Sequence, residues 1–178
     1  MNPSLRTSQT APESDAEMSP PAECEPVLIL GVGNILLMDD GVGVHVARRL
    51  QIRPPPGTAV VDVGTDFPSA IPHLQHRRAA LVIDAMDTGG PPGSIYYCPW
   101  EDVRDSCCAH SVHEMGLRSV VESLGRNASG MLHVLGVQPA RIGYGLHMSP
   151  EVIASLDAVA QAACEIAGLL TQDCHSFG

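Results

Sequence analysis

The stretch Val27–Val46, VLILGVGNILLMDDGVGVHV, contains the features that decide the fold of this chain. Its first four residues are continuous and aliphatic, as in a strand buried on both faces of a parallel sheet. After a glycine-rich turn, Val42 and Val46 begin a run of apolar residues at helical spacing. The turn carries two carboxylates, Asp39 and Asp40. Because open α/β sheets bind ligands where strands lead into helices, this turn is a candidate functional site.

Other interpretations of the turn are open at this stage. Asp39 or Asp40 could cap the following helix and oppose the positive end of its dipole. Gly31 and Gly33 also suggest a dinucleotide-binding loop, but that fingerprint requires a third glycine where this chain has Leu36. Two carboxylates would also repel a pyrophosphate. A Walker-type phosphate loop is excluded, because all ten basic residues are arginine and no lysine exists to reach a phosphate.

Composition restricts the class of protein further. A length of 178 residues predicts one domain with a single core. The formal net charge of −10 and an aromatic content of only 3% argue against a nucleic-acid partner, which needs cationic and stacking side chains. No apolar run approaches membrane-spanning length, so no membrane association is expected. The six cysteines follow no disulfide framework, which favours a reduced, cytoplasmic location.

The chain divides into three predicted parts. Residues 1–26, rich in Ser, Pro, Glu and Ala, are expected to form a disordered N-terminal extension, residues 27–170 the folded domain, and residues 171–178 a frayed tail. Within the domain, apolar patterns predict strands at 27–30, 58–63, 79–83, 94–98 and 131–137, and helices at 41–51, 68–75, 115–124 and 149–170. The strand at 94–98 has mixed faces, which is typical of a sheet edge, and residues 99–111 are polar and irregular. The alternation predicts an α/β fold, a three-layer sandwich with a twisted, largely parallel sheet flanked by helices.

Three side chains suggest a metal site. Asp40 follows the first predicted strand, Asp84 follows the strand at 79–83, and His113 precedes a predicted helix. The carboxyl ends of parallel strands meet at one edge of a sheet, so we expect these groups to lie close together. Two carboxylates and one imidazole can hold a divalent metal with open positions, and this ligand set suits zinc, nickel or iron(II) better than calcium.

Competing local interpretations involve the cysteines and histidines near position 110. Cys107, Cys108, His110 and His113 could form a soft-metal cluster, although their spacing is not an established zinc motif. A cysteine nucleophile paired with His110 or His113 is another possibility. A histidine ahead of a helix could also be a cap or a surface residue. The chain has no Gly-x-Ser-x-Gly elbow, which disfavours a serine hydrolase of the common α/β type.

Taken together, five segments resemble the nickel–iron hydrogenase maturation endopeptidases: Leu30–Gly43, Gly64-Thr65, Ile83–Ala85, His113 and Leu135–Pro139. In that family the second acid of the acidic pair, the acid after the third strand and the histidine ahead of the helix bind metal. The resemblance assigns these roles to Asp40, Asp84 and His113. One departure is that the family usually shows Asp-Gly-Gly-Thr after the second strand, whereas this chain has Asp62-Val63-Gly64-Thr65.

The resemblance implies an endopeptidase that removes a C-terminal extension from the precursor of a hydrogenase large subunit. The recognition signal would be nickel already inserted in that precursor, and no nucleotide cofactor is expected. Asp40 or Asp84 could act as a general base toward water, or the metal could polarise the scissile carbonyl. We expect a monomer. The alternatives are a non-catalytic nickel metallochaperone, which the same three ligands would serve, and a nucleotide-binding module.

Overall fold

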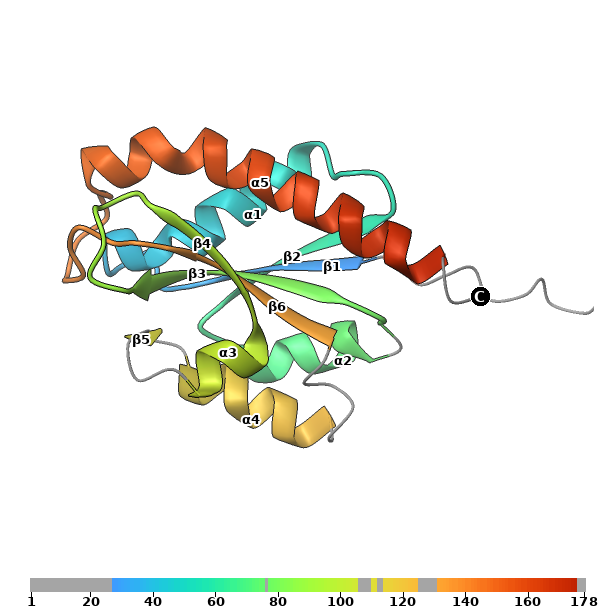
Figure 1. Ribbon diagram of the computed structural model, residues 1–178. Coiled ribbons are helices and arrows are strands. Elements are labelled where there is room, and N and C mark those ends of the chain that lie inside the picture. Colours follow the sequence, from blue (N-terminus) through green and yellow to red (C-terminus); the bar gives the residue numbers. More distant parts are fainter. Residues whose placement is uncertain (1–26, 76, 106–109, 112–113, 125–130, 176–178) are drawn as a thin grey trace, which may run out of the picture.

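The computed structural model describes residues 27–75, 77–105, 110–111, 114–124 and 131–175 (Figure 1). Its strands are β1 (Val27–Val32), β2 (Thr58–Gly64), β3 (Ala80–Asp87), β4 (Ile95–Pro99), β5 (His110–Ser111) and β6 (Leu132–Val137). Its α-helices are α1 (Val42–Ile52), α2 (Ile71–Leu74), α3 (Trp100–Asp105), α4 (Glu114–Leu124) and α5 (Pro150–His175). Two short 3-10 helices, η1 (Asp39–Gly41) and η2 (Phe67–Ala70), precede α1 and α2. The predicted extension, residues 1–26, lies outside the described residues.

The strands form one sheet in the order β2-β1-β3-β6-β4. Strands β2, β1, β3 and β6 are mutually parallel, whereas β4 pairs antiparallel with β6 at the edge, and the two-residue β5 pairs antiparallel with β3. The register places Gly31 of β1 beside Ile83 of β3. The predicted α/β fold with a largely parallel sheet is therefore confirmed, as is the edge position of the strand that begins near residue 94.

Helices cover both faces of this sheet and complete three layers. Helices α1 and α5 lie on one face, and α2, α3 and α4 lie on the other (Figure 1). Side chains of β1 alternate between the two cores: Ile29 packs in the core beneath α1 and α5, and Leu28 and Leu30 pack in the core that includes Trp100. Each large aliphatic side chain buried in this way stabilises the fold by about 1.5–3 kcal/mol.

Two segments differ from the sequence-based expectations because of tertiary pairing. The third strand was expected to end before Asp84, but β3 continues to Asp87, since β6 and β5 supply partners as far as Ala85 and Asp87. The segment 99–111 was expected to be irregular, but α3 begins within it, because Trp100 is buried in the core. Both cases depend on partners distant in sequence.

Helix α5 is longer than the sequence predicted, and it is strongly apolar. It continues to His175, past the predicted end at residue 170, and the Thr171 hydroxyl donates to the Ala167 carbonyl in its last turns. By length and composition alone, 150–172 would be long and apolar enough to cross a membrane, since an 18-residue window within it has a mean hydropathy of 1.5. However, Val152 and Val159 are fully buried against the sheet. In this fold α5 therefore packs one face on the core, while 22% of its apolar window is buried and Ile153 and Leu169 are exposed.

Candidate active site at the carboxyl edge of the sheet

Asp40 lies in η1, between the end of β1 and the start of α1, and its side chain is 0% exposed. Its Oδ2 accepts a hydrogen bond from the Asn34 backbone N–H at 2.7 Å, and the Asn34 Oδ1 in turn accepts from Leu36 N at 2.9 Å. Gly33 makes this turn possible: its φ is +134°, and a β-carbon there would lie 2.0 Å from the Asp40 carbonyl oxygen. The strand-to-helix turn thus holds Asp40 in a fixed position.

Asp84 lies in β3, where it pairs with Gly136 of β6, and it is 3% exposed. The start of α1 is packed directly on this part of the sheet. A β-carbon on Gly43 would lie 2.0 Å from the Ile83 carbonyl oxygen and 2.4 Å from that of Val32. Because Asp40 precedes Gly43 by three residues and Asp84 follows Ile83, both buried carboxylates belong to the same edge of the sheet.

The third predicted ligand, His113, lies outside the described residues, as do Cys107 and Cys108. Of His110, the structure describes the backbone, which pairs with Asp87. Among the side chains that are described, no three His, Cys, Asp or Glu residues come close enough together to hold a metal. Of the three predicted metal ligands, the structure therefore describes two, Asp40 and Asp84. Both are buried oxygen donors, which together with a third ligand suit a hard or borderline divalent cation.

Asp39 is not a cap for the following helix, as one interpretation of the sequence had suggested. Neither η1 nor α1 has a side-chain hydrogen bond at its N-cap. Instead, the fully buried Asp39 carboxylate accepts four hydrogen bonds from a distant segment. Its Oδ2 accepts from Ala140 N (2.9 Å), Arg141 N (2.8 Å) and Ser149 Oγ (2.8 Å), and its Oδ1 accepts from Ser149 N (2.6 Å).

Gln138 is a second buried polar residue at this edge, directly after β6. Its Oε1 accepts from Thr88 N (2.8 Å), Thr88 Oγ1 (3.0 Å) and Gly90 N (3.2 Å), and its Nε2 donates to Asp87 Oδ1 at 2.9 Å. The amide therefore fixes the turn that follows β3, the strand of Asp84. Gln138 belongs to the Leu135–Pro139 segment of the family resemblance, but nothing in the sequence indicated that its amide bonds the turn after β3.

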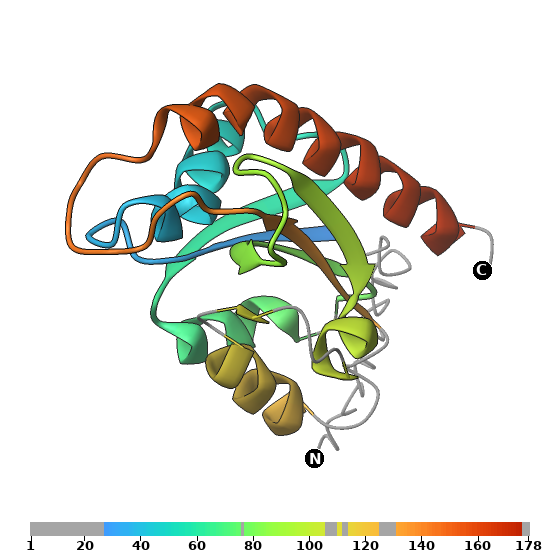
Figure 2. The same ribbon diagram turned by 60° about the vertical axis from the view of Figure 1, so that its left-hand side comes forward.

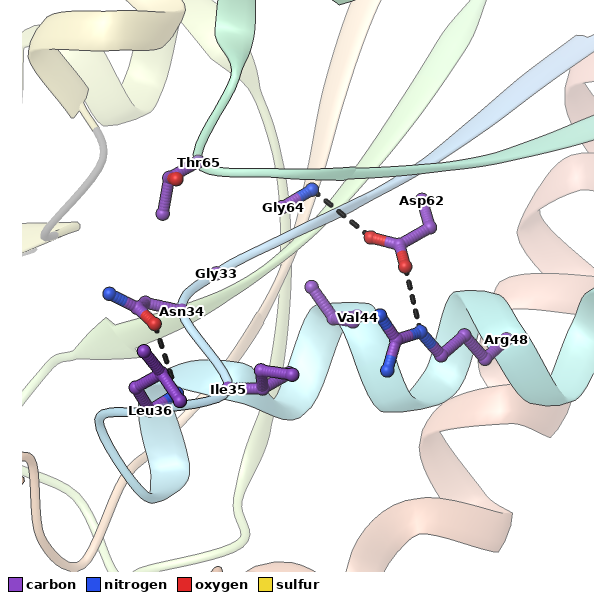
Figure 3. Close-up of a pocket in the computed structure, with 9 residues that line it drawn as sticks. All are labelled: Gly33, Asn34, Ile35, Leu36, Val44, Arg48, Asp62, Gly64 and Thr65. Carbon is purple, nitrogen blue, oxygen red and sulfur yellow. Dashed lines mark hydrogen bonds and ion pairs between the residues drawn. The ribbon is translucent and has the colours of Figure 1, made fainter. Parts of the chain in front are cut away.

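A cleft of about 260 Å³ opens beside the turn of Asp40 (Figure 3). Its walls come from the β1–α1 turn, from α1 and from the end of β2. The lining residues are Gly33, Asn34, Ile35, Leu36, Val44, Arg48, Asp62, Gly64 and Thr65. The Arg48 guanidinium pairs with Asp62 at 2.7 Å, and the other Asp62 oxygen accepts from Gly64 N at 3.1 Å. The Asp-Val-Gly-Thr variant of the motif thus forms one wall of the cleft.

Two cysteines and a histidine outside this edge lie in surroundings that shift their pKa values toward the neutral form. Burial raises the pKa of the Cys98 and Cys164 thiols, with nearby acidic side chains contributing, so both remain protonated at neutral pH. Burial also lowers the pKa of His133, whose ring stacks on Tyr97, with Nδ1 2.9 Å from the Tyr97 hydroxyl. None of these groups has the character of an activated nucleophile.

Comparison with known proteins now distinguishes among the functions left open by the sequence. The family model described as hydrogenase maturation protease matches residues 44–166. The chain belongs to the hydrogenase maturation protease family. The hydrogenase expression/formation protein HupD of Rhodobacter capsulatus is 32% identical over 151 residues, which are 80% of this chain and 71% of that protein.

Solved structures of hydrogenase maturation proteases have the same fold. The HybD protease from Thermococcus kodakarensis has a TM-score of 0.71 and 28% identity, and the match covers 80% of this chain and 99% of that one. The HybD endopeptidase from E. coli has a TM-score of 0.67 and 26% identity, and the match covers 78% of this chain and 89% of that one. Membership of this family makes the chain a peptidase and favours that activity over a nucleotide-binding module or a non-catalytic metallochaperone.

Proposed function

We propose that this hydrogenase maturation protease removes a C-terminal extension from the precursor of a nickel–iron hydrogenase large subunit after nickel has been inserted. Family membership supports the peptidase activity and the class of substrate. The observation that carries the assignment of the site is the pair of buried carboxylates, Asp40 and Asp84, at the carboxyl edge of the sheet. Asp40 is joined to the neighbouring cleft through Asn34, which lines the cleft and donates its backbone N–H to Asp40 Oδ2.

In this proposal Asp40, Asp84 and His113 engage the nickel ion that the precursor carries. A buried carboxylate is costly unless it is hydrogen-bonded, paired or coordinated, and two carboxylates at one edge also repel each other. A divalent cation offsets both costs. Because the nickel arrives with the substrate, this arrangement would couple recognition to the state of the precursor: cleavage proceeds only after the metal has been loaded.

For hydrolysis, a water molecule must lose a proton as it attacks the scissile carbonyl. Asp40 and Asp84 are the residues that we propose for this role. The Asn34 N–H that donates to Asp40 Oδ2 holds one oxygen of that carboxylate in place, which fixes the direction of its other oxygen. Nickel in the precursor would add Lewis-acid polarisation of a nearby carbonyl.

The cleft beside Asp40 is the proposed place for the substrate chain. It is lined by apolar side chains, which include Val44 and Leu36, and by the Arg48–Asp62 ion pair. We also propose that the protein acts as a monomer in the cytoplasm. The support for a reducing compartment is that Cys98 and Cys164 are free thiols.

The test is to mix the purified protein with a large-subunit precursor that carries its extension, with and without nickel, and to record intact masses. Loss of a C-terminal peptide from the nickel-loaded precursor alone supports a nickel-gated endopeptidase. Cleavage of both forms would support the peptidase and contradict the role of nickel. Nickel retention or transfer without cleavage would contradict the proposed reaction and favour the metallochaperone alternative.

A further inference from the structure

The segment between β6 and α5 forms a loop, residues 138–149, that extends beyond the sheet next to the β1–α1 turn (Figure 2). Backbone hydrogen bonds join the two segments: Met38 N donates to Gly145 O at 3.0 Å, and Gly145 N donates to Leu36 O at 2.9 Å. Met38 itself has a φ of +58°, which is rare for a residue with a side chain, so these contacts hold the turn in a strained conformation.

Large apolar side chains are exposed where the loop and the turn meet. Tyr144 is 95% exposed, Leu146 66% and Leu36 57%, and Ile142 is also exposed. Leu36 in addition lines the cleft beside Asp40. Because Gly145 N donates to Leu36 O, the neighbouring Tyr144 and Leu146 lie close to Leu36 and so to the proposed substrate cleft. We call these four residues the apolar rim.

The four hydrogen bonds to Asp39 connect this loop to the active-site turn. Asp39 lies next to Asp40 in sequence, yet its partners are 101 to 110 residues away, at both ends of the rim-bearing part of the loop. A buried carboxylate that accepts three backbone N–H groups and a hydroxyl is a strong anchor, because charge-assisted hydrogen bonds are stronger than neutral ones.

We infer that Asp39 is a positioning residue, which holds the apolar rim beside Asp40 so that the rim contacts the precursor polypeptide next to the scissile bond. This inference rests on the proposed function. The precursor is the expected occupant because Leu36 belongs both to the rim and to the cleft that we assign to the precursor chain. Asp39 acts through the loop and has no role in proton transfer.

The inference predicts effects on substrate binding rather than on the chemical step. In Asp39→Asn, one oxygen can still accept from Ala140, Arg141 and the Ser149 hydroxyl, but the new amide NH₂ faces the Ser149 N–H. We expect KM for the nickel-loaded precursor to rise roughly tenfold, with kcat within about twofold. Ser149→Ala removes a single hydroxyl donor and should raise KM less. Tyr144→Ala removes part of the rim itself and should raise KM without changing the melting temperature.

A double-mutant cycle separates positioning from a general loss of structure. If Asp39 acts by placing the rim, Asp39→Asn will raise KM by a smaller factor in the Tyr144→Ala background than in the wild type. Leu169→Ala is the matched control for the rim, because Leu169 is a 62% exposed apolar residue near the opposite end of α5. Asp157→Asn is the control for loss of a carboxylate, since Asp157 lies on the surface of α5. Neither control should change KM.

Three results would overturn the inference while leaving the proposed function intact: an unchanged KM in Asp39→Asn, a loss confined to kcat, or factors that simply multiply in the double mutant. If Asp39→Asn does not fold, unchanged KM values in Ser149→Ala and Tyr144→Ala would overturn it equally. If the wild type does not cleave, the proposed function fails. In that case the inference is tested by the dissociation constants of the same variants for the nickel-loaded precursor. We expect Asp39→Asn to raise the dissociation constant more than Ser149→Ala does, and Tyr144→Ala to raise it as well.

Discussion

Gly43 and Ile83 are in direct backbone contact, and a β-carbon on Gly43 would lie 2.0 Å from the Ile83 carbonyl oxygen. This contact brings the first turn of α1 against β3 one residue before Asp84. Only glycine, which has no β-carbon, can make this contact. The glycine-rich sequence is therefore needed for the close packing of α1 on the strand of Asp84.

Gly43→Ala should destabilise the protein by about 1–3 kcal/mol, because the added methyl group must push α1 away from β3. The same shift should lower cleavage activity by displacing Asp40 relative to Asp84. Urea denaturation measures the first effect. Gly168→Ala is the control: Gly168 lies within α5 with nothing within 4 Å of an added β-carbon, so this change should stabilise the protein by about 0.5–1 kcal/mol. Equal effects of the two substitutions would contradict the close packing of α1.

Gln138→Leu should lower the free energy of unfolding by about 1–3 kcal/mol, since Thr88 N and Gly90 N would lose a buried acceptor. The turn after β3 should then exchange its amide hydrogens faster, which hydrogen-exchange mass spectrometry can follow. Gln161→Leu offers a comparison on the exposed surface of α5, where the amide bonds to Glu165 alone. We expect a change within about 0.5 kcal/mol there. A stable Gln138→Leu with unchanged exchange would show that the amide network is dispensable.

Acidification should destabilise the fold through His133 and His45. Burial lowers the pKa of both imidazoles from the usual 6.5, so the unfolded chain binds protons more readily than the folded one. The free energy of unfolding should therefore fall as the pH drops from about 7 through the usual histidine pKa and below it. His133→Gln should make this dependence shallower, as measured by urea denaturation over a pH series. An identical slope in the variant would remove His133 from the explanation.

Much of the fold could be predicted because the buried strands are continuous aliphatic runs, as at Leu28–Leu30, and because strands and helices alternate. The position of Asp40 and Asp84 at one edge followed from the same topology. The function of Asp39 could not be predicted, since its partners lie more than 100 residues away and carry no local signal. The same holds for Trp100, which starts a helix in a polar segment because the core receives its ring.

The most direct test of the proposed site is single-turnover cleavage of the nickel-loaded precursor by Asp84→Asn, Asp40→Asn and His113→Ala, with Asp157→Asn as the matched surface control. Each site variant should cleave at least about a hundredfold more slowly than the wild type, while circular dichroism shows an intact fold and the control cleaves normally. Wild-type cleavage rates in folded Asp40→Asn and Asp84→Asn would contradict the assignment of these carboxylates to the active site.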